Sequence, residues 1–218
     1  RKGAVLGGGL LGLEAAKALI DLGLEETHVI EFAPRLMPRQ IDSAGSAMLR
    51  YKLESLGLKV HMNKSTSGIL GTDNIKGLQF ADETSLDVDI LVISAGIRPR
   101  DELGKACGLE MGVRGGIVVN DRMQTSDPDI YAIGEVALYQ QMIYGLVAPG
   151  YEMAEVAVNQ ILKNTEVVMR PEIDMSTKLK LIGVDVASFG IPYMPVDKGL
   201  SIIYENKTKG IYKRINVS

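Results

Sequence analysis

Short apolar runs alternate with helix-like segments from the start of the chain. Ala4-Val5-Leu6 is an apolar run that predicts a buried strand and leads directly into a group of glycines. The following segment repeats apolar residues at helical spacing, and Gly23 stands where a helix C-terminal cap belongs. The apolar face predicted for this helix consists of Leu11, Ala15, Ala18, Leu19 and Leu22.

The same pattern repeats once more. Thr27 to Glu31 predicts a second strand, and Leu58 to Met62 predicts a third. Between them Leu49, Leu53 and Leu56 follow helical spacing, with Gly57 as the stop. Strand, helix, strand, helix, strand is the order of a mononucleotide-binding unit with right-handed crossovers.

Residues 64–89 have a different character. Leu78 and Phe80 alternate with polar residues, and Gly- and Asp-rich breaks separate the short runs. This pattern predicts a short antiparallel excursion. Ile90 to Ile93 is continuously apolar, which predicts a return to a buried strand that ends in a tight turn at Ser94-Ala95-Gly96.

The remaining chain divides into two further regions. In the first, Ile117 to Val119 and Ile130 to Ile133 predict core strands, and Tyr151 to Leu162 predicts a helix. From about residue 170, Lys178 to Leu181 alternates in the manner of a strand. Two apolar stretches, Leu200–Tyr204 and Ile211–Val217, flank a turn at residues 206–210 and predict a hairpin.

Composition narrows the class of protein. The 218 residues are 46% hydrophobic and 23% charged, which is ordinary for a globular protein. The net charge is −3 without a long basic run, which argues against nucleic acid as a partner. No apolar stretch approaches the roughly 20 residues that span a bilayer, so no membrane is expected. Cys107 is the only cysteine, so these residues hold neither an internal disulfide nor a cysteine-ligated iron–sulfur cluster. This pattern fits a cytoplasmic location.

The glycine loop Gly7-Gly8-Gly9-Leu10-Leu11-Gly12 is the first candidate site. A lone glycine motif is weak, but this one follows a predicted strand and opens a predicted helix. Gly7, Gly9 and Gly12 stand where a dinucleotide site needs a tight turn, close approach to the pyrophosphate and close helix packing. The helix N-terminus, including Leu11, offers N–H groups to the diphosphate. The alternative is a purely structural turn.

Glu31 is the candidate for the adenosine ribose. It lies 24 positions after Gly7, at the end of the second predicted strand. A 2′-phosphate there would meet a like charge, with a repulsion of about 4 kcal/mol at about 4 Å and an effective dielectric of about 20. Glu31 therefore favours NAD over NADP. Arg35 has two open interpretations, a partner that neutralises such a phosphate or a solvated turn residue.

The stretch Gly7 to Glu14 resembles the NAD loop of flavoprotein pyridine-nucleotide reductases. The resemblance implies that Glu14 lies near the nicotinamide and the flavin, as the catalytic candidate. Without it, Glu14 would only be a favourable charge in the first turn of a helix. Leu10 occupies the place where many members carry an aromatic gate.

A second segment, Thr125 to Glu135, resembles the strand–Gly–acid motif that closes the FAD site in two-dinucleotide flavoproteins. The resemblance gives Gly134 and Glu135 a role in FAD binding, with Glu135 on the ribityl chain. It also implies that a helix opening near Pro149-Gly150-Tyr151 points its N-terminus at the flavin ring. Gly96, at the crossing between the two regions, is included among the cofactor-binding residues. The alternative for Glu135 is a turn cap.

Four longer stretches narrow the resemblance to the large subunits of bacterial NAD(P)H-dependent nitrite reductases. They are residues 27–34, 94–101, 144–151 and 178–186. Such subunits pass hydride from NADH to FAD and then electrons through iron–sulfur centres to sirohaem, where nitrite becomes ammonium. Those later centres are expected only outside this chain, since their cysteine ligands are absent from it.

The resemblance implies an α/β fold in three parts. Residues 1–96 form a Rossmann-type NAD(P)-binding domain with a β-meander excursion, residues 97–166 form the C-terminal part of an FAD-binding domain, and residues 167–218 begin a β-rich domain. In that class an FAD glycine loop precedes the NAD domain, so we expect an internal piece of a larger enzyme that is inactive alone. Its partners would be NADH, the N-terminal FAD segment and downstream redox domains, and self-association into a homo-oligomer would cover apolar surface left exposed.

Two rival functions stay open. One is an FAD-dependent NADH reductase of a small electron carrier of the ferredoxin or rubredoxin type. The other is a non-catalytic NAD-binding sensor, against which the FAD-type segment argues. No metal site is expected, because His28 and His61 have no acidic or cysteine partner at ligand spacing and are interpreted as structural.

Overall fold

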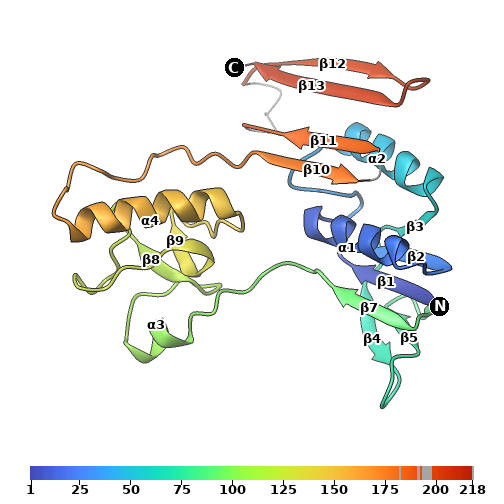
Figure 1. Ribbon diagram of the computed structural model, residues 1–218, viewed down its shortest axis with the longest axis horizontal. Coiled ribbons are helices and arrows are strands. Elements are labelled where there is room, and N and C mark those ends of the chain that lie inside the picture. Colours follow the sequence, from blue (N-terminus) through green and yellow to red (C-terminus); the bar gives the residue numbers. More distant parts are fainter. Residues whose placement is uncertain (182, 191, 193–197, 218) are drawn as a thin grey trace. The chain divides into compact units, whose positions relative to one another are not determined.

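The computed structural model describes residues 1–181, 183–190, 192 and 198–217 (Figure 1). Ile182 and Ser218, which the sequence analysis included in its last region, lie outside these residues. The chain forms two compact units, one made of Arg1–Gly96 with Ser176–Ser218 and the other of Ile97–Met175.

The first unit is built on a parallel four-stranded sheet in the order β3-β2-β1-β7. Its strands are β1 (Lys2–Leu6), β2 (Glu26–Ile30), β3 (Leu58–His61) and β7 (Ile90–Ile93). Each strand pairs in parallel with its neighbour, and the crossovers between β1, β2 and β3 are the helices α1 (Leu10–Asp21) and α2 (Ser43–Ser55). The predicted α/β class with a Rossmann-type sheet is confirmed.

Two layers cover the two faces of this sheet, because successive side chains of a strand alternate between faces. Val5, Val29 and Val60 point into one core together with the buried residues of α1 and α2. Ala4 and Ile30 point the other way, against the antiparallel meander. That meander consists of β4 (Thr66–Leu70), β5 (Gly77–Phe80) and β6 (Ser85–Asp87), as the alternation in residues 64–89 predicted.

The predicted face of α1 is right for Leu19 and Ala15, which pack in or against the core, and wrong for its other three residues. The helix buries Gly12, Leu13, Ala16 and Leu19, whereas Leu11, Ala18 and Leu22 are exposed. Glu14, Lys17 and Asp21 stand at positions i, i+3 and i+7 and form a charged stripe along one side of the helix, so the opposite side turns inward. On that inward side Gly12 packs closely on the carbonyl of Gly7.

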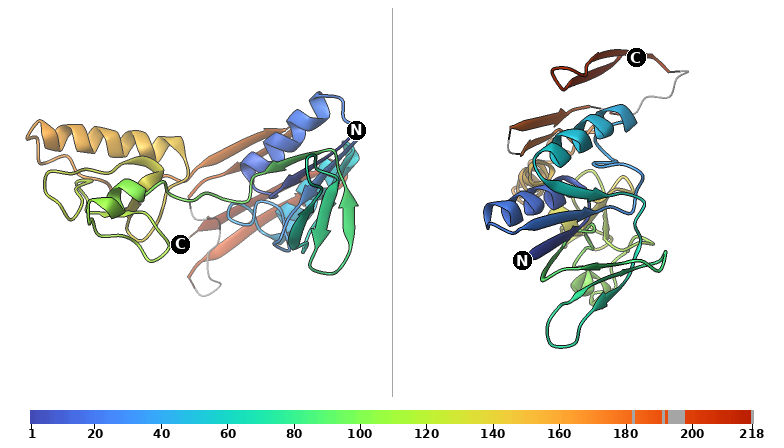
Figure 2. Two further views of the ribbon diagram at one scale, coloured as in Figure 1. Left: turned by 90° about the horizontal axis from the view of Figure 1, so that it is seen from below. Right: turned by 90° about the vertical axis from the view of Figure 1, so that its right-hand side faces the viewer.

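The last four strands of the first unit form two hairpins (Figures 1 and 2). They are β10 (Thr177–Leu181) with β11 (Val184–Ser188) and β12 (Leu200–Asn206) with β13 (Ile211–Val217). Leu179 and Val184 join the core that α1 and α2 share. The hydroxyl of Tyr212 and the guanidinium of Arg214 donate to the carboxylate of Asp42 at 2.5 and 2.8 Å, and Asp42 is the N-cap of α2. The predicted C-terminal β-rich region is confirmed.

The second unit has a smaller sheet. Its elements are α3 (Glu102–Ala106), β8 (Ile117–Val119), the 3-10 turn η1 (Gly134–Val136), β9 (Ala137–Tyr139) and α4 (Val147–Ile161). In this unit β8 and β9 form a two-stranded parallel sheet.

Three predictions near these elements and β7 are corrected. Residues 130–133 form only an isolated bridge between Gln124 and Tyr131, and β9 takes the place beside β8. The Thr125 N–H donates to the Ile130 carbonyl and the Ala132 N–H donates to the Met123 carbonyl, and these two bonds make up that bridge. The last helix begins at Val147 rather than Tyr151. Finally, β7 is an edge strand and is only partly buried.

Candidate functional site

The glycine loop joins β1 to α1 through Gly7, Gly8 and Gly9. Gly7 has a φ of +114°, and a Cβ there would overlap the carbonyl oxygen of Ser94 at the end of β7. A Cβ on Gly12 would overlap the carbonyl oxygen of Gly7. The fold itself therefore requires both glycines, whatever the loop binds.

Gly9 behaves differently. It is the N-cap of α1 with an ordinary φ of −81°, and no described atom lies within 4 Å of the place its Cβ would take. The first bond of the helix runs from the Leu13 N–H to the Gly9 carbonyl at 3.0 Å, so the N–H groups of Leu10, Leu11 and Gly12 precede it. The open space at Gly9 thus adjoins N–H groups and a positive helix end suited to an anion.

The Glu31 carboxylate reaches into the same loop. Its Oε2 accepts from the Gly8 N–H at 2.6 Å, and its Oε1 accepts from the Ala33 N–H at 2.7 Å. The Met37 N–H donates to the Gly8 carbonyl at 2.9 Å, so the Gly8 residue is held on both sides. A carboxylate has about four acceptor positions, which leaves about two for the hydroxyls of a ligand. Sequence reasoning missed the part played by Gly8 and Met37, because backbone contacts leave no residue-type signal.

Arg35 lies half-buried in the loop after Glu31. Its Nη2 donates to the carbonyl of Pro38 at 3.4 Å. This position differs from that of a fully solvated turn residue, which was one of its two interpretations. Part of the guanidinium is engaged within the loop.

Glu14 is exposed on α1. The helix begins at Leu10, so Glu14 is one residue beyond the first turn, and the expected first-turn position is wrong. The interpretation of Glu14 as a simple charge at the helix N-terminus is thereby weakened, since that effect fades beyond the first turn. Gly96 follows β7 with a φ of +95° and open space around its Cα.

The predicted residues of the second unit surround the start of α4. Gly134 has a φ of +73°, and its N–H lies 3.3 Å from the sulfur of Met153 on α4. A Cβ on Gly150 would lie 3.7 Å from the Cα of Gly134, so the turn packs on the first turns of the helix. Pro149 is buried and Tyr151 is exposed. The helix N-cap, Leu146, makes no side-chain capping bond.

Glu135 lies in the 3-10 turn and is exposed. Its carboxylate makes no hydrogen bond or ion pair to any residue that the structure describes. The interpretation of Glu135 as a turn cap is therefore not supported by its contacts.

A histidine pair lies on β2 and β3, with His28 buried and His61 partly buried. Nδ1 of His28 is 3.0 Å from Nε2 of His61, and Nε2 of His28 is 3.2 Å from Oε2 of Glu26. Burial lowers the pKa of both histidines, although Glu26 acts to raise the pKa of His28. Hydrogen bonds from Lys59 and His28 lower the pKa of Glu26 to about 2. The acidic partner of His28 was not predicted. Glu26 and His28 are two residues apart on one strand, so their side chains lie on the same face.

The part of the chain that the structure describes contains no group of three or more His, Cys, Asp or Glu residues arranged to hold a metal ion. None of the helices within that part is long and apolar enough to cross a membrane.

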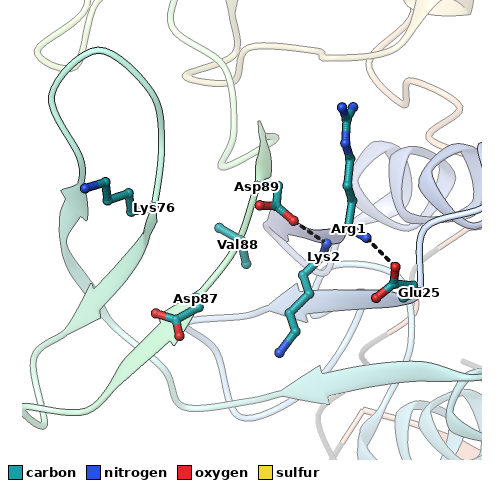
Figure 3. Close-up of a pocket in the computed structure, with 7 residues that line it drawn as sticks. All are labelled: Arg1, Lys2, Glu25, Lys76, Asp87, Val88 and Asp89. Atoms are coloured by element: carbon teal, nitrogen blue, oxygen red, sulfur yellow. Dashed lines mark hydrogen bonds and ion pairs between the residues drawn. The ribbon is translucent and has the colours of Figure 1, made fainter.

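A charged hollow lies at the other end of the parallel sheet, where β1 and β7 begin (Figure 3). The Lys2 N–H donates to Asp89 at 2.8 Å, and Glu25 pairs with the amino group of Arg1 at 2.9 Å. Ligands of open parallel sheets bind at the carboxyl ends of the strands. The glycine loop lies at those carboxyl ends and the hollow does not.

Three comparisons with known proteins bear on this site. The family model described as pyridine nucleotide-disulphide oxidoreductase matches residues 1–160. The NADH nitrite reductase large subunit of Escherichia coli is 53% identical over 220 residues, covering 100% of this chain and 26% of that protein. The NAD(P)H nitrite reductase of Bacillus subtilis is 42% identical over 215 residues, covering 99% of this chain and 26% of that protein. The chain thus spans about a quarter of the length of these relatives.

A solved structure gives the same result for the fold. The FAD-dependent pyridine nucleotide-disulphide oxidoreductase from Desulfovibrio vulgaris superposes with a TM-score of 0.80 at 27% identity, covering 94% of this chain and 53% of that one. The resemblance that the motifs indicated is confirmed by these similarities.

Proposed function

The chain belongs to the pyridine nucleotide-disulphide oxidoreductase family, and from that premise we propose that it is the NADH-binding part of a cytoplasmic nitrite reductase. The proposal rests mainly on the hydrogen bond from the Gly8 N–H to the Glu31 carboxylate, next to the open space at Gly9. This arrangement supports a dinucleotide site that is formed before ligand arrives. The 53% identity with an NADH nitrite reductase large subunit supports the choice of enzyme.

The roles of the residues follow from their positions. Gly9 leaves room for the pyrophosphate, and the N–H groups at the start of α1, Leu11 included, neutralise part of its charge. Glu31 accepts from the ribose hydroxyls and repels a 2′-phosphate, so NADH is preferred to NADPH. Arg35 would act only on the 2′-phosphate of NADPH, whose charge it could partly neutralise, and the resemblance assigns Glu14 to the nicotinamide end, with Gly96 among the cofactor-binding residues.

Residues 97–166 contribute to an FAD site in the proposal. Flavin supplies the ability to accept a hydride from NADH and pass electrons on singly. The exposed Glu135 carboxylate fits such a site, because it has acceptor positions to offer to hydroxyl groups. The uncapped start of α4, with Pro149 and Tyr151, favours negative charge near it. Nitrite reduction to ammonium would take place in domains beyond these residues.

A domain exchange tests the proposal. The corresponding region of the Escherichia coli relative would be replaced by this chain, and NADH-dependent ammonium formation from nitrite would be measured. We expect activity in the exchanged enzyme and its loss when Glu31→Ala is added, with flavin content unchanged. An exchanged enzyme that keeps its flavin but does not reduce nitrite with NADH would contradict the proposal.

A further inference from the structure

Phe32 is an exposed aromatic residue in a loop that also contains two buried apolar side chains. Its side chain is 76% exposed, whereas Leu36 and Met37 in the same loop are 0% and 1% exposed. A phenylalanine gains free energy from burial, and the chain has only three. Phe189 is equally exposed, so exposure alone does not distinguish Phe32, and what distinguishes it is its place next to Glu31.

The backbone on either side of Phe32 is fixed. The Glu31 N–H donates to the His61 carbonyl at 2.8 Å, and the Glu31 carbonyl accepts from the Lys64 N–H at 3.0 Å. Ala33 donates to the Glu31 carboxylate at 2.7 Å, and its carbonyl accepts from the Asn63 N–H at 3.2 Å. These bonds fix the backbone on both sides of Phe32, and with it the direction of its Cα–Cβ bond. The loop holds the ring out at the carboxyl edge of the sheet.

This position adjoins the carboxylate proposed to bind the adenosine ribose. The adenine base is joined to that same ribose, so it lies beside the sugar that Glu31 is proposed to hold, and Phe32 is the residue that follows Glu31. Bases stack on aromatic rings because every base offers a π-face, and each such stack contributes substantially to binding. A fixed ring also loses little entropy when a ligand arrives.

We propose that Phe32 is a positioning residue of the dinucleotide site whose ring packs against the adenine base. The inference rests on the NADH site proposed above. It assigns the affinity for the adenosine half of the cofactor to two neighbouring residues, Glu31 for the ribose and Phe32 for the base.

The test compares Phe32→Ala and Phe32→Tyr with a matched control, Phe189→Ala. Phe189 is also 76% exposed, so the control removes an equally exposed ring elsewhere in the chain. Dissociation constants for NADH and for ADP-ribose, which retains the adenine and lacks the nicotinamide, would be measured by calorimetry. NMR would follow the adenine H2 and H8 resonances, which a stacked ring shifts upfield.

We expect Phe32→Ala to raise both dissociation constants about five- to 150-fold and to abolish the upfield shift. Phe32→Tyr and Phe189→Ala should keep the wild-type values. The inference is overturned if the wild-type chain binds NADH and Phe32→Ala binds it equally well, or if no upfield shift occurs in the wild type. A wild-type chain that binds neither ligand would instead remove the proposed function, and this inference with it.

Discussion

Glu31 in the first unit and Glu135 in the second were both predicted to bind the hydroxyl groups of a cofactor, yet their surroundings differ. Glu31 is held by two backbone N–H groups, at 2.6 and 2.7 Å. Glu135 is exposed, and no residue that the structure describes forms a hydrogen bond to its carboxylate. The Glu31 carboxylate is therefore bonded within the fold, whereas the Glu135 carboxylate is exposed.

The glycines repeat this contrast. Gly7 and Gly12 are required by backbone contacts within the first unit, whereas no described atom lies within 4 Å of the place that a Cβ on Gly134 would take. The sheets differ in the same sense, with four parallel strands in the first unit and two in the second. Parallel sheets are normally buried on both faces, so two parallel strands alone give a binding site little support. The comparison indicates that the first site is organised by this chain and that the second depends on what it binds.

The largest expected effect comes from the glycine loop itself. Gly12→Ala should destabilise the first unit by about 1–3 kcal/mol or more, because its Cβ would overlap the Gly7 carbonyl. Gly9→Ala should change the stability by less than about 0.5 kcal/mol, because the space is open. Thermal unfolding of the two variants would measure the difference. Equal losses of stability would show that the two glycines do not have the separate roles assigned here.

The second test compares the two acids. Glu31→Ala leaves the N–H groups of Gly8 and Ala33 without their carboxylate acceptor, which should cost about 1–2 kcal/mol. Glu135→Ala should be neutral within about 0.5 kcal/mol. Urea unfolding would give the free energies, and hydrogen exchange should show faster exchange at the Gly8 and Ala33 amides in Glu31→Ala alone. Unchanged exchange at these amides would break the comparison.

The sequence predicted the first unit better than the second, for a physical reason. Strands β1, β2 and β3 are apolar runs between helices with glycine stops, so local pattern and tertiary packing agree there. Residues 130–133 are as apolar as a strand, but their pairing is limited to the single bridge between Gln124 and Tyr131, which the local pattern does not reveal. The face of α1 was predictable from the charged residues Glu14, Lys17 and Asp21, which mark the side away from the core, but the apolar spacing alone led to another face. The positions of Glu31 and Glu135 follow from motif spacing, but their different surroundings do not.

The third prediction uses pH. Both histidines of the chain are in the first unit, and burial lowers the pKa of each below its value in the unfolded chain. The unfolded state therefore binds more protons, so their contribution to stability is complete above about pH 6.5 and is lost as the pH falls through the lower folded values. We expect the first unit to lose stability between pH 7.5 and 5.5, and His61→Gln to lose less. The same dependence on pH in the variant and the wild type would contradict this.

The smallest expected effect is at Tyr151, whose side chain is exposed on α4. Tyr151→Ala should leave the unfolding free energy within about 0.5 kcal/mol of the wild type, because it removes no buried contact. Met153→Ala, two residues along the same helix and fully buried, is the matched control and should cost about 2–5 kcal/mol. If Tyr151→Ala lowers the free energy of unfolding as much as Met153→Ala does, Tyr151 stabilises the second unit and is not kept only for a ligand.

The most direct test of the account is a calorimetric titration of the chain with NADH and with NADPH. The loop in which Gly8 and Ala33 donate to Glu31 predicts that one NADH binds per chain and that NADPH binds more weakly. Glu31→Ala should narrow the difference in affinity between the two nucleotides. Equal affinity for the two nucleotides, or no binding of NADH at all, would contradict the claim that residues 1–96 contain a ready-formed site for NADH.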